Sequence, residues 1–192
     1  RLVGAEIEWI SPAQYRERAH VMERGAQQLA RAGHRPYVIP EGGSNALGAW
    51  GYVRAFAELA TEMGDLSDTT IVYAAGSGGT GAGLILGALL HKSPVRIVGF
   101  AVCDDRDYFV KTIGDICDQA IAEYKLNLAF DRTRHVEILD GYVGLGYAKS
   151  RPEELALLRD VAREEALLLD PVYTGKAFFG LTEELRKNPR AF

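Results

Sequence analysis

Hydrophobic residues follow two spacings along this chain, and the two alternate. Short runs with almost no polar interruption are typical of parallel strands that are buried on both faces of a sheet. They predict strands at residues 2–10, 37–40, 70–75, 95–102 and 135–139. Between these runs, apolar residues recur at helical spacing. This predicts helices at residues 46–63, 82–92, 106–126 and 151–169, and a last helix from about residue 174.

One more helix is predicted from its capping sequence. Ser11 can cap a helix, Pro12 suits the first turn, and Gln14 completes a capping box, so we expect a helix that runs to about Ala32 and stops at Gly33. Strands that alternate with helices indicate an α/β fold, in which a twisted, mostly parallel sheet carries helices on both faces. Ligands of such sheets collect at the carboxyl ends of the strands. We expect three glycine-rich loops to lie there, at residues 41–45, 76–81 and 140–147.

Composition narrows the classes of function. The chain has 192 residues, 47% of them apolar, and a formal charge of -4, which gives no electrostatic reason to expect nucleic acid or an anionic membrane as partner. No apolar run approaches the ~20 residues that span a bilayer. Cys103 and Cys117 are too few for a disulfide framework, which favours reduced thiols and a cytoplasmic location. No metal site is predicted, because metal-ligand spacing is lacking among His20, His34, His91 and His135.

The motif that carries chemistry is the glycine loop GSGGTG at residues 76–81, between a predicted strand and a predicted helix. A triphosphate-binding loop would end in Lys-Ser or Lys-Thr, so that interpretation is discarded. The spacing matches the dinucleotide fingerprint G-x-G-x-x-G, with Asp104 or Asp105 placed to bind a ribose. These aspartates also suit the N-terminal cap of the next helix. Alternatively, the amides of residues 77–81, the Ser77 and Thr80 hydroxyls and the positive end of the helix form a cup for one phosphate.

Three further motifs decide between these two interpretations. They are RPYVIPEGGSNALGAWGYV (35–53), GLGYAKSRPEE (144–154) and LLLDPVYTGKAFFGL (167–181). These motifs resemble segments of the family of D-cysteine desulfhydrases and 1-aminocyclopropane-1-carboxylate (ACC) deaminases, which are pyridoxal-phosphate (PLP) enzymes of the tryptophan-synthase-β-like fold. The resemblance covers nearly the whole chain. It implies that the cofactor is PLP, that the partner is a small-molecule amino acid substrate, and that the enzyme is a homodimer.

The resemblance also implies roles for individual residues. The PLP phosphate is expected on Ser77, Gly78, Gly79, Thr80 and Gly81. Two active-site tyrosines are expected at Tyr147 and Tyr173, and a pocket lining at Gly43, Ser44 and Asn45. Thr174 stands where the deaminase branch has a glutamate that faces the pyridine nitrogen of PLP. Thr174 is therefore expected to contact the cofactor with a neutral hydrogen bond. This favours the desulfhydrase branch, whose reaction is β-elimination from a D-amino acid, D-cysteine giving pyruvate, hydrogen sulfide and ammonia.

Parts of the family pattern have no match in this sequence. The Schiff-base lysine of the family matches none of the lysines present, and Lys176 is predicted to be a structural residue at a helix start. We therefore expect the catalytic lysine outside this chain, which begins with Arg1 and stops before the family's final glycine-rich turn. The expected organisation is a fragment: residues 1–32 are the tail of the smaller N-terminal-side domain with its connecting helix, and residues 33–192 are the large PLP-binding domain, incomplete at its C-terminus.

Other functions remain as alternatives to D-cysteine desulfhydrase. Within the same family, the chain can belong to an ACC deaminase or to another PLP lyase. Outside it, the glycine loop with Asp104 or Asp105 can belong to an NAD-binding Rossmann domain. A non-catalytic fragment that binds a phosphate-bearing ligand is the third class.

Overall fold

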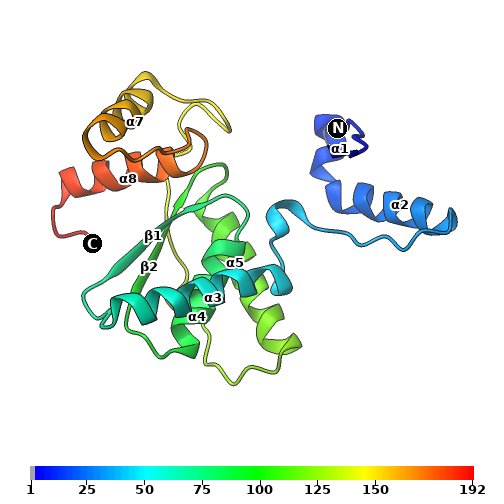
Figure 1. Cartoon of the computed structure of the whole chain (residues 1–192), viewed down its shortest axis with the longest axis horizontal. Helices are drawn as coiled ribbons and strands as arrows, with labels where there is room; N and C mark the ends of the chain where they lie inside the picture. Colours follow the sequence, from blue (N-terminus) through cyan, green and yellow to red (C-terminus); the bar gives the residue numbers. More distant parts are fainter. Residues whose placement is uncertain (1–2) are drawn as a thin grey trace. The chain divides into compact units, whose positions relative to one another are not determined.

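The computed structural model describes residues 3–192 (Figure 1). The chain divides into two compact units between Glu41 and Gly42. The predicted domain boundary after residue 32 concerns the whole protein and stays a prediction. No helix in the described range is both long enough and apolar enough to cross a membrane.

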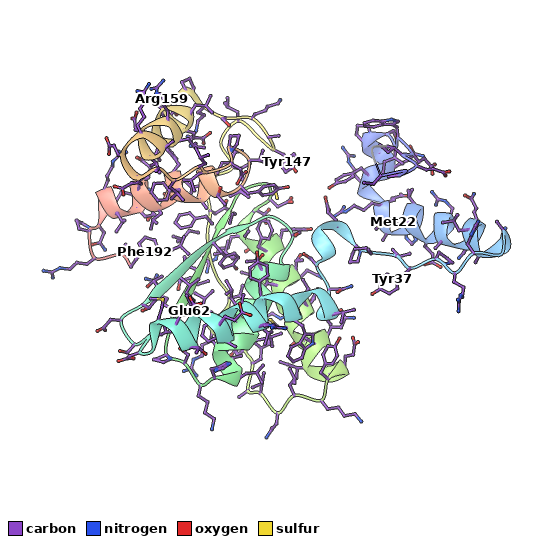
Figure 2. All side chains as sticks on the ribbon, viewed as in Figure 1. Met22, Tyr37, Glu62, Tyr147, Arg159 and Phe192 are labelled. Carbon is purple, nitrogen blue, oxygen red and sulfur yellow. The ribbon has the colours of Figure 1, made fainter. Side chains whose placement is uncertain are left out.

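In the first unit, residues 3–41 are described, and they contain the helices α1 (Pro12–Arg16) and α2 (Arg18–Arg31). The predicted capping box is confirmed, because Ser11 and Gln14 each accept the other's backbone N–H. The predicted single helix is interrupted at Glu17, whose φ of -108° and ψ of 28° are not helical. The strands predicted at 2–10 and 37–40 are wrong for residues 3–10 and 37–40, and residue 2 lies outside the described residues. A strand needs a neighbour to accept and donate its hydrogen bonds, and Tyr37 is 70% exposed instead (Figure 2).

The second unit is built on a three-stranded parallel sheet in the order β1-β2-β3. The predicted strands are confirmed as β1 (Thr70–Ala75), β2 (Arg96–Ala101) and a short β3 (Glu137–Leu139). The predicted helices are confirmed as α3 (Ala46–Met63), α4 (Gly79–Leu90), α5 (Arg106–Glu123), α7 (Pro152–Glu165) and α8 (Thr174–Lys187). Two short helical segments lie at η1 (Glu41–Gly43) and α6 (Arg132–His135), and α6 was not expected from the sequence.

Both faces of the sheet are buried, as the apolar strand pattern predicts. In β2, Ile97 and Ala101 belong to the core shared with α3, α4 and α5, whereas Val98 and Phe100 belong to a second core that includes Ala177 of α8. Figure 1 shows α3, α4 and α5 on one side of β1 and β2, and α7 and α8 on the other. Successive side chains of a strand point to opposite faces, so an uninterrupted apolar run fills both cores.

Helix α4, which follows the glycine loop, is fixed by close packing on α3. A Cβ added to Gly83 would lie 2.3 Å from the carbonyl oxygen of Ala49, and one added to Gly87 would lie 2.6 Å from the Cβ of Phe56. Only glycine permits the two helices to approach this closely. The start of α4, and with it the loop at residues 76–81, therefore has a fixed position at the carboxyl end of β1.

Candidate functional site

The glycine loop turns the chain from β1 into α4 within a few residues. Gly78 adopts a left-handed conformation with φ 97°, which a residue with a Cβ rarely adopts. The first i→i-4 bond of the helix runs from the Ala82 N–H to the Gly78 carbonyl. The preceding amides, including those of Thr80 and Gly81, belong to the helix N-terminus, where intrahelical acceptors are lacking. Such a helix start binds anions through its N–H groups and its dipole.

Within the second unit, residues 42–45 of the preceding turn lie directly against this loop. The Ser44 hydroxyl oxygen accepts the N–H of Gly79 at 3.0 Å, and the same hydroxyl donates to the Ser77 hydroxyl oxygen at 2.8 Å. A Cβ added to Gly42 would lie 2.3 Å from the Ser77 Oγ. The first two glycine-rich loops are therefore in contact. One amide of the predicted phosphate cup, that of Gly79, is already bonded to Ser44.

The neighbours of Ser44 in this turn have local structural contacts. The Gly43 carbonyl accepts the Asn45 N–H, which closes the turn. The Asn45 side chain accepts the Gly48 N–H at 2.7 Å and caps α3. The pocket-lining roles of these residues stay predictions, because the contacts seen within the chain are those of a turn and a helix cap.

The two predicted tyrosines are brought together by the fold. Their hydroxyl oxygens are 2.6 Å apart, and the rings meet edge to face with centroids 6.0 Å apart. Tyr147 lies on the loop before α7, beside the start of α8 that carries Tyr173 (Figure 2). A Cβ added to Gly76 would lie 2.9 Å from Cε1 of Tyr173, so the pair stands next to the glycine loop. Since either phenol can donate to the other, the pair can hold a shared proton at this place.

Thr174 is engaged with Asp170, four residues before it. Its hydroxyl oxygen accepts the Asp170 N–H at 3.0 Å, and its hydroxyl donates to the Asp170 carboxylate. That carboxylate also accepts the N–H groups of Val172, Tyr173 and Thr174. Partial burial raises the pKa of Asp170, but the bonds from Thr174 and the backbone amides outweigh it and leave the pKa below its usual value. The predicted contact of Thr174 with the pyridine ring stays a prediction, and its observed role is in the cap of α8.

These residues fit a phosphate-bearing cofactor. The loop joins a helix start to two hydroxyls, and Ser77 and Thr80 remain partly exposed while Gly78, Gly79 and Gly81 are buried. That donor set, with no basic side chain in the loop, suits one phosphate group held by amides and hydroxyls. Asp105, the candidate ribose ligand of the dinucleotide interpretation, accepts the Tyr108 N–H at 2.8 Å and caps α5, which confirms the predicted helix cap.

The contacts of three charged residues near the tyrosines were not predicted from the sequence, although Lys176 was expected to be structural. Lys176 is buried and donates to the carbonyls of Val143 and Gly146. Glu154 is buried and forms an ion pair with Arg151 at 2.8 Å. No role at the start of α8 was predicted for Asp170, whose carboxylate accepts the N–H groups of Tyr173 and Thr174 there. The Asp-Pro pair upstream of Thr174 could have indicated the cap, whereas no signal in a single sequence indicates that Lys176 and Glu154 are buried.

Known proteins that resemble this chain are pyridoxal-phosphate-dependent enzymes, which agrees with a phosphate-binding loop at residues 76–81. The family model described as pyridoxal-phosphate dependent enzyme matches residues 1–191. A bifunctional D-cysteine desulfhydrase/ACC deaminase of Arabidopsis thaliana is 38% identical over the whole chain, which covers 48% of that relative. A putative ACC deaminase of Thermotoga maritima is 39% identical over 98% of the chain and 60% of the relative. A D-cysteine desulfhydrase of Klebsiella pneumoniae is 36% identical over 86% of the chain and 49% of the relative.

A solved structure shows the same fold. The crystal structure of an ACC deaminase homologue superposes with a TM-score of 0.82 at 36% identity, over 97% of this chain and 55% of the other. The chain thus spans about half the length of the relatives it matches. The fold and the family predicted from the sequence are confirmed, and the family favours PLP over a dinucleotide as the ligand of the glycine loop. This chain belongs to the family of pyridoxal-phosphate-dependent enzymes.

Proposed function

We propose that the whole protein is a PLP-dependent lyase that performs β-elimination on a D-amino acid. For D-cysteine, the substrate and one water give pyruvate, hydrogen sulfide and ammonia. The observation that supports this most directly is the juxtaposition of the helix-start loop with the Tyr147–Tyr173 pair across Gly76. This juxtaposition supports the proposal because a helix start can bind a phosphate and paired phenols can hold or move a proton.

Each part of the chain has a defined task in this proposal. The hydroxyls of Ser77 and Thr80 and the amides of residues 77–81 other than that of Gly79 bind the cofactor phosphate, and Ser44 fixes that loop through Gly79 and Ser77. The paired phenols hold a proton beside the site. When PLP is bound, it supplies an electron sink that makes the Cα proton of an amino acid acidic. The lysine that links PLP covalently is proposed to lie outside this chain.

Elimination is proposed ahead of ring opening because of Thr174. A hydroxyl bonded to the Asp170 carboxylate cannot supply the negative charge that a glutamate would place at this position. ACC deamination is the second candidate, because the Arabidopsis relative carries both names and the Thermotoga relative is named a putative ACC deaminase.

The experiment begins with the purified full-length protein. Its visible spectrum should contain the absorption band of lysine-bound PLP, and borohydride reduction should abolish the band and label one lysine outside residues 1–192 by peptide mass spectrometry. Sulfide and pyruvate should form from D-cysteine faster than from L-cysteine, and faster than 2-oxobutyrate forms from ACC. Absence of the band together with enhanced NADH fluorescence on mixing would overturn the proposal. If Thr174→Glu leaves the ratio of elimination to ring opening unchanged, the preference for elimination inferred from Thr174 would be overturned.

The assembly and the location are proposed from the family resemblance alone. We expect a homodimer by light scattering after size-exclusion chromatography. We expect the protein in the cytoplasmic fraction of its cells. A monomer that is fully active would argue against the first proposal, and recovery from another compartment would argue against the second.

A further inference from the structure

Lys176 is buried and has no carboxylate partner among the residues that the structure describes. Among the described residues, Glu154 and Lys176 are the buried charged side chains, each with 1% exposure. Taking an ammonium group out of water is costly unless hydrogen bonds replace its hydration. Here Nζ donates to the carbonyl of Val143 at 2.6 Å and to that of Gly146 at 2.7 Å. Its buried partners are therefore two backbone oxygens of one loop.

These two carbonyls organise the loop that carries Tyr147. The Val143 carbonyl also accepts the N–H of Gly146, and the Gly146 carbonyl accepts the N–H of Lys149. Two consecutive turns thus meet at Gly146, and one ammonium group bonds to the acceptor of each. Tyr147 lies within the second turn, and its side chain is 58% exposed. Packing restrains so exposed a ring only weakly, so its position depends on the backbone beneath it.

The start of α8 carries both the residue that contacts the Tyr147 side chain and the residue that contacts the Tyr147 loop. Tyr173 and Lys176 are three residues apart at the beginning of α8. The Tyr173 hydroxyl lies 2.6 Å from the Tyr147 hydroxyl. The Lys176 ammonium group donates to two carbonyls of the loop that carries Tyr147. We propose that Lys176 is a positioning residue: it fixes the Tyr147 loop to the start of α8 and thereby sets the distance between the two phenols. The importance of this distance for catalysis rests on the proposed function.

The first test uses a readout that needs no turnover. The full-length holoenzyme is labelled with 3-fluorotyrosine, and the ¹⁹F resonances of the pair are assigned with Tyr147→Phe and Tyr173→Phe. Lys176→Met should shift or broaden both resonances and leave that of Tyr52, on α3, in place. Lys149→Met is the matched control, because Lys149 is an exposed lysine of the same loop, and it should move neither resonance. A folded Lys176→Met protein with both resonances at their wild-type positions would overturn the proposal.

Kinetics separate positioning from general stability. With D-cysteine, kcat of Lys176→Met should fall roughly 10- to 100-fold, the loss typical of a group displaced by about 1 Å. Lys176→Arg, which keeps a cationic donor, should recover part of the rate. The double variant Lys176→Met/Tyr147→Phe should be no slower than Tyr147→Phe alone, because both changes disable the same group. A double variant whose loss is the product of the single losses would contradict action through Tyr147.

A misfolded variant and a failure of the proposed function can each be distinguished from a failure of the positioning proposal. If Lys176→Met does not fold, the ¹⁹F comparison is made with Lys176→Gln, whose shorter side chain stops short of the two carbonyls, and unmoved resonances there overturn the proposal equally. Wild-type protein that binds PLP but eliminates nothing from D-cysteine would overturn the proposed function. It would leave the ¹⁹F comparison to decide whether Lys176 positions the tyrosines.

Discussion

Gly81 in the first turn of α4 is the position at which one added methyl group should disturb the cofactor loop most directly. A Cβ there would lie 2.2 Å from the hydroxyl oxygen of Tyr73, 2.7 Å from its Cζ and 3.0 Å from the side chain of Ile113. The contact with Cζ is nearly 1 Å closer than the ~3.5 Å at which carbon atoms meet comfortably. Tyr73 cannot retreat, because its ring also lies against Gly99 on the neighbouring strand. The start of α4 must therefore move.

The expected magnitude is the difference between two opposing effects. Overpacking a buried site costs about 1–3 kcal/mol, whereas replacing glycine by alanine inside a helix gains about 0.5–1 kcal/mol. Gly81→Ala should therefore lower the free energy of unfolding by up to about 2.5 kcal/mol, and it should be about 1–3 kcal/mol less stable than an unhindered Gly→Ala variant. Displaced amides at the loop should also raise the Kd of PLP about tenfold, which corresponds to ~1.4 kcal/mol, near the value of one hydrogen bond to a charged group.

The assay is urea unfolding of the full-length protein, followed by PLP titration of the apoenzyme. Gly51→Ala is the matched control, because Gly51 lies in α3 and a Cβ there meets no atom within 4 Å. It should raise the free energy of unfolding by about 0.5–1 kcal/mol and leave PLP binding unchanged. Adding Tyr73→Phe to Gly81→Ala removes the closest contact and should recover part of the loss. A Gly81→Ala protein that is as stable as Gly51→Ala and binds PLP normally would refute the packing of Tyr73 beneath the loop.

Three further outcomes are expected. Ser44→Ala leaves the buried Gly79 N–H without its acceptor, so the free energy of unfolding should fall by about 1–3 kcal/mol, and an unchanged urea midpoint would contradict this. Asp170→Asn should cost about 1 kcal/mol near neutral pH, because a neutral amide replaces a carboxylate that accepts three backbone N–H groups at the start of α8. Because the pKa of Asp170 is lowered in the fold, its stabilisation is complete above the unfolded pKa of about 3.9, so the deficit of the variant should narrow as the pH falls below that value, and a constant deficit would argue against it. Burial raises the pKa of the Cys117 thiol to about 12. This leaves roughly a thousandfold less thiolate at pH 8 than an ordinary cysteine has, so peptide mass spectrometry should find Cys117 alkylated by iodoacetamide only after unfolding in urea, and labelling of the native protein would show that the site is open.

The sequence by itself determined the α/β core and the place of the glycine loop. A strand that is buried on both faces needs an uninterrupted apolar run, and a helix that is buried on one face needs apolar residues at helical spacing, so both patterns can be recognised in the local sequence. The β1 and β2 strands and α3 were therefore predicted to within a residue or so. The caps at Ser11 and Asp105 were predictable for a similar reason, since each acts within three residues. Residues 37–40 show the limit of this approach, because a strand is defined by its pairing partner and not by its own apolar residues.

Only the tertiary structure decided which groups meet at the site. Tyr147 and Tyr173 are 26 positions apart, Ser44 and Ser77 are 33, and Lys176 reaches a carbonyl 33 positions away. A single sequence records the chemistry of each side chain but not the partner that folding brings to it. Local patterning could therefore assign Lys176 to a helix start, whereas its burial and its bonds to the tyrosine loop depend on how α8 packs against the sheet and on the path of the loop after β3.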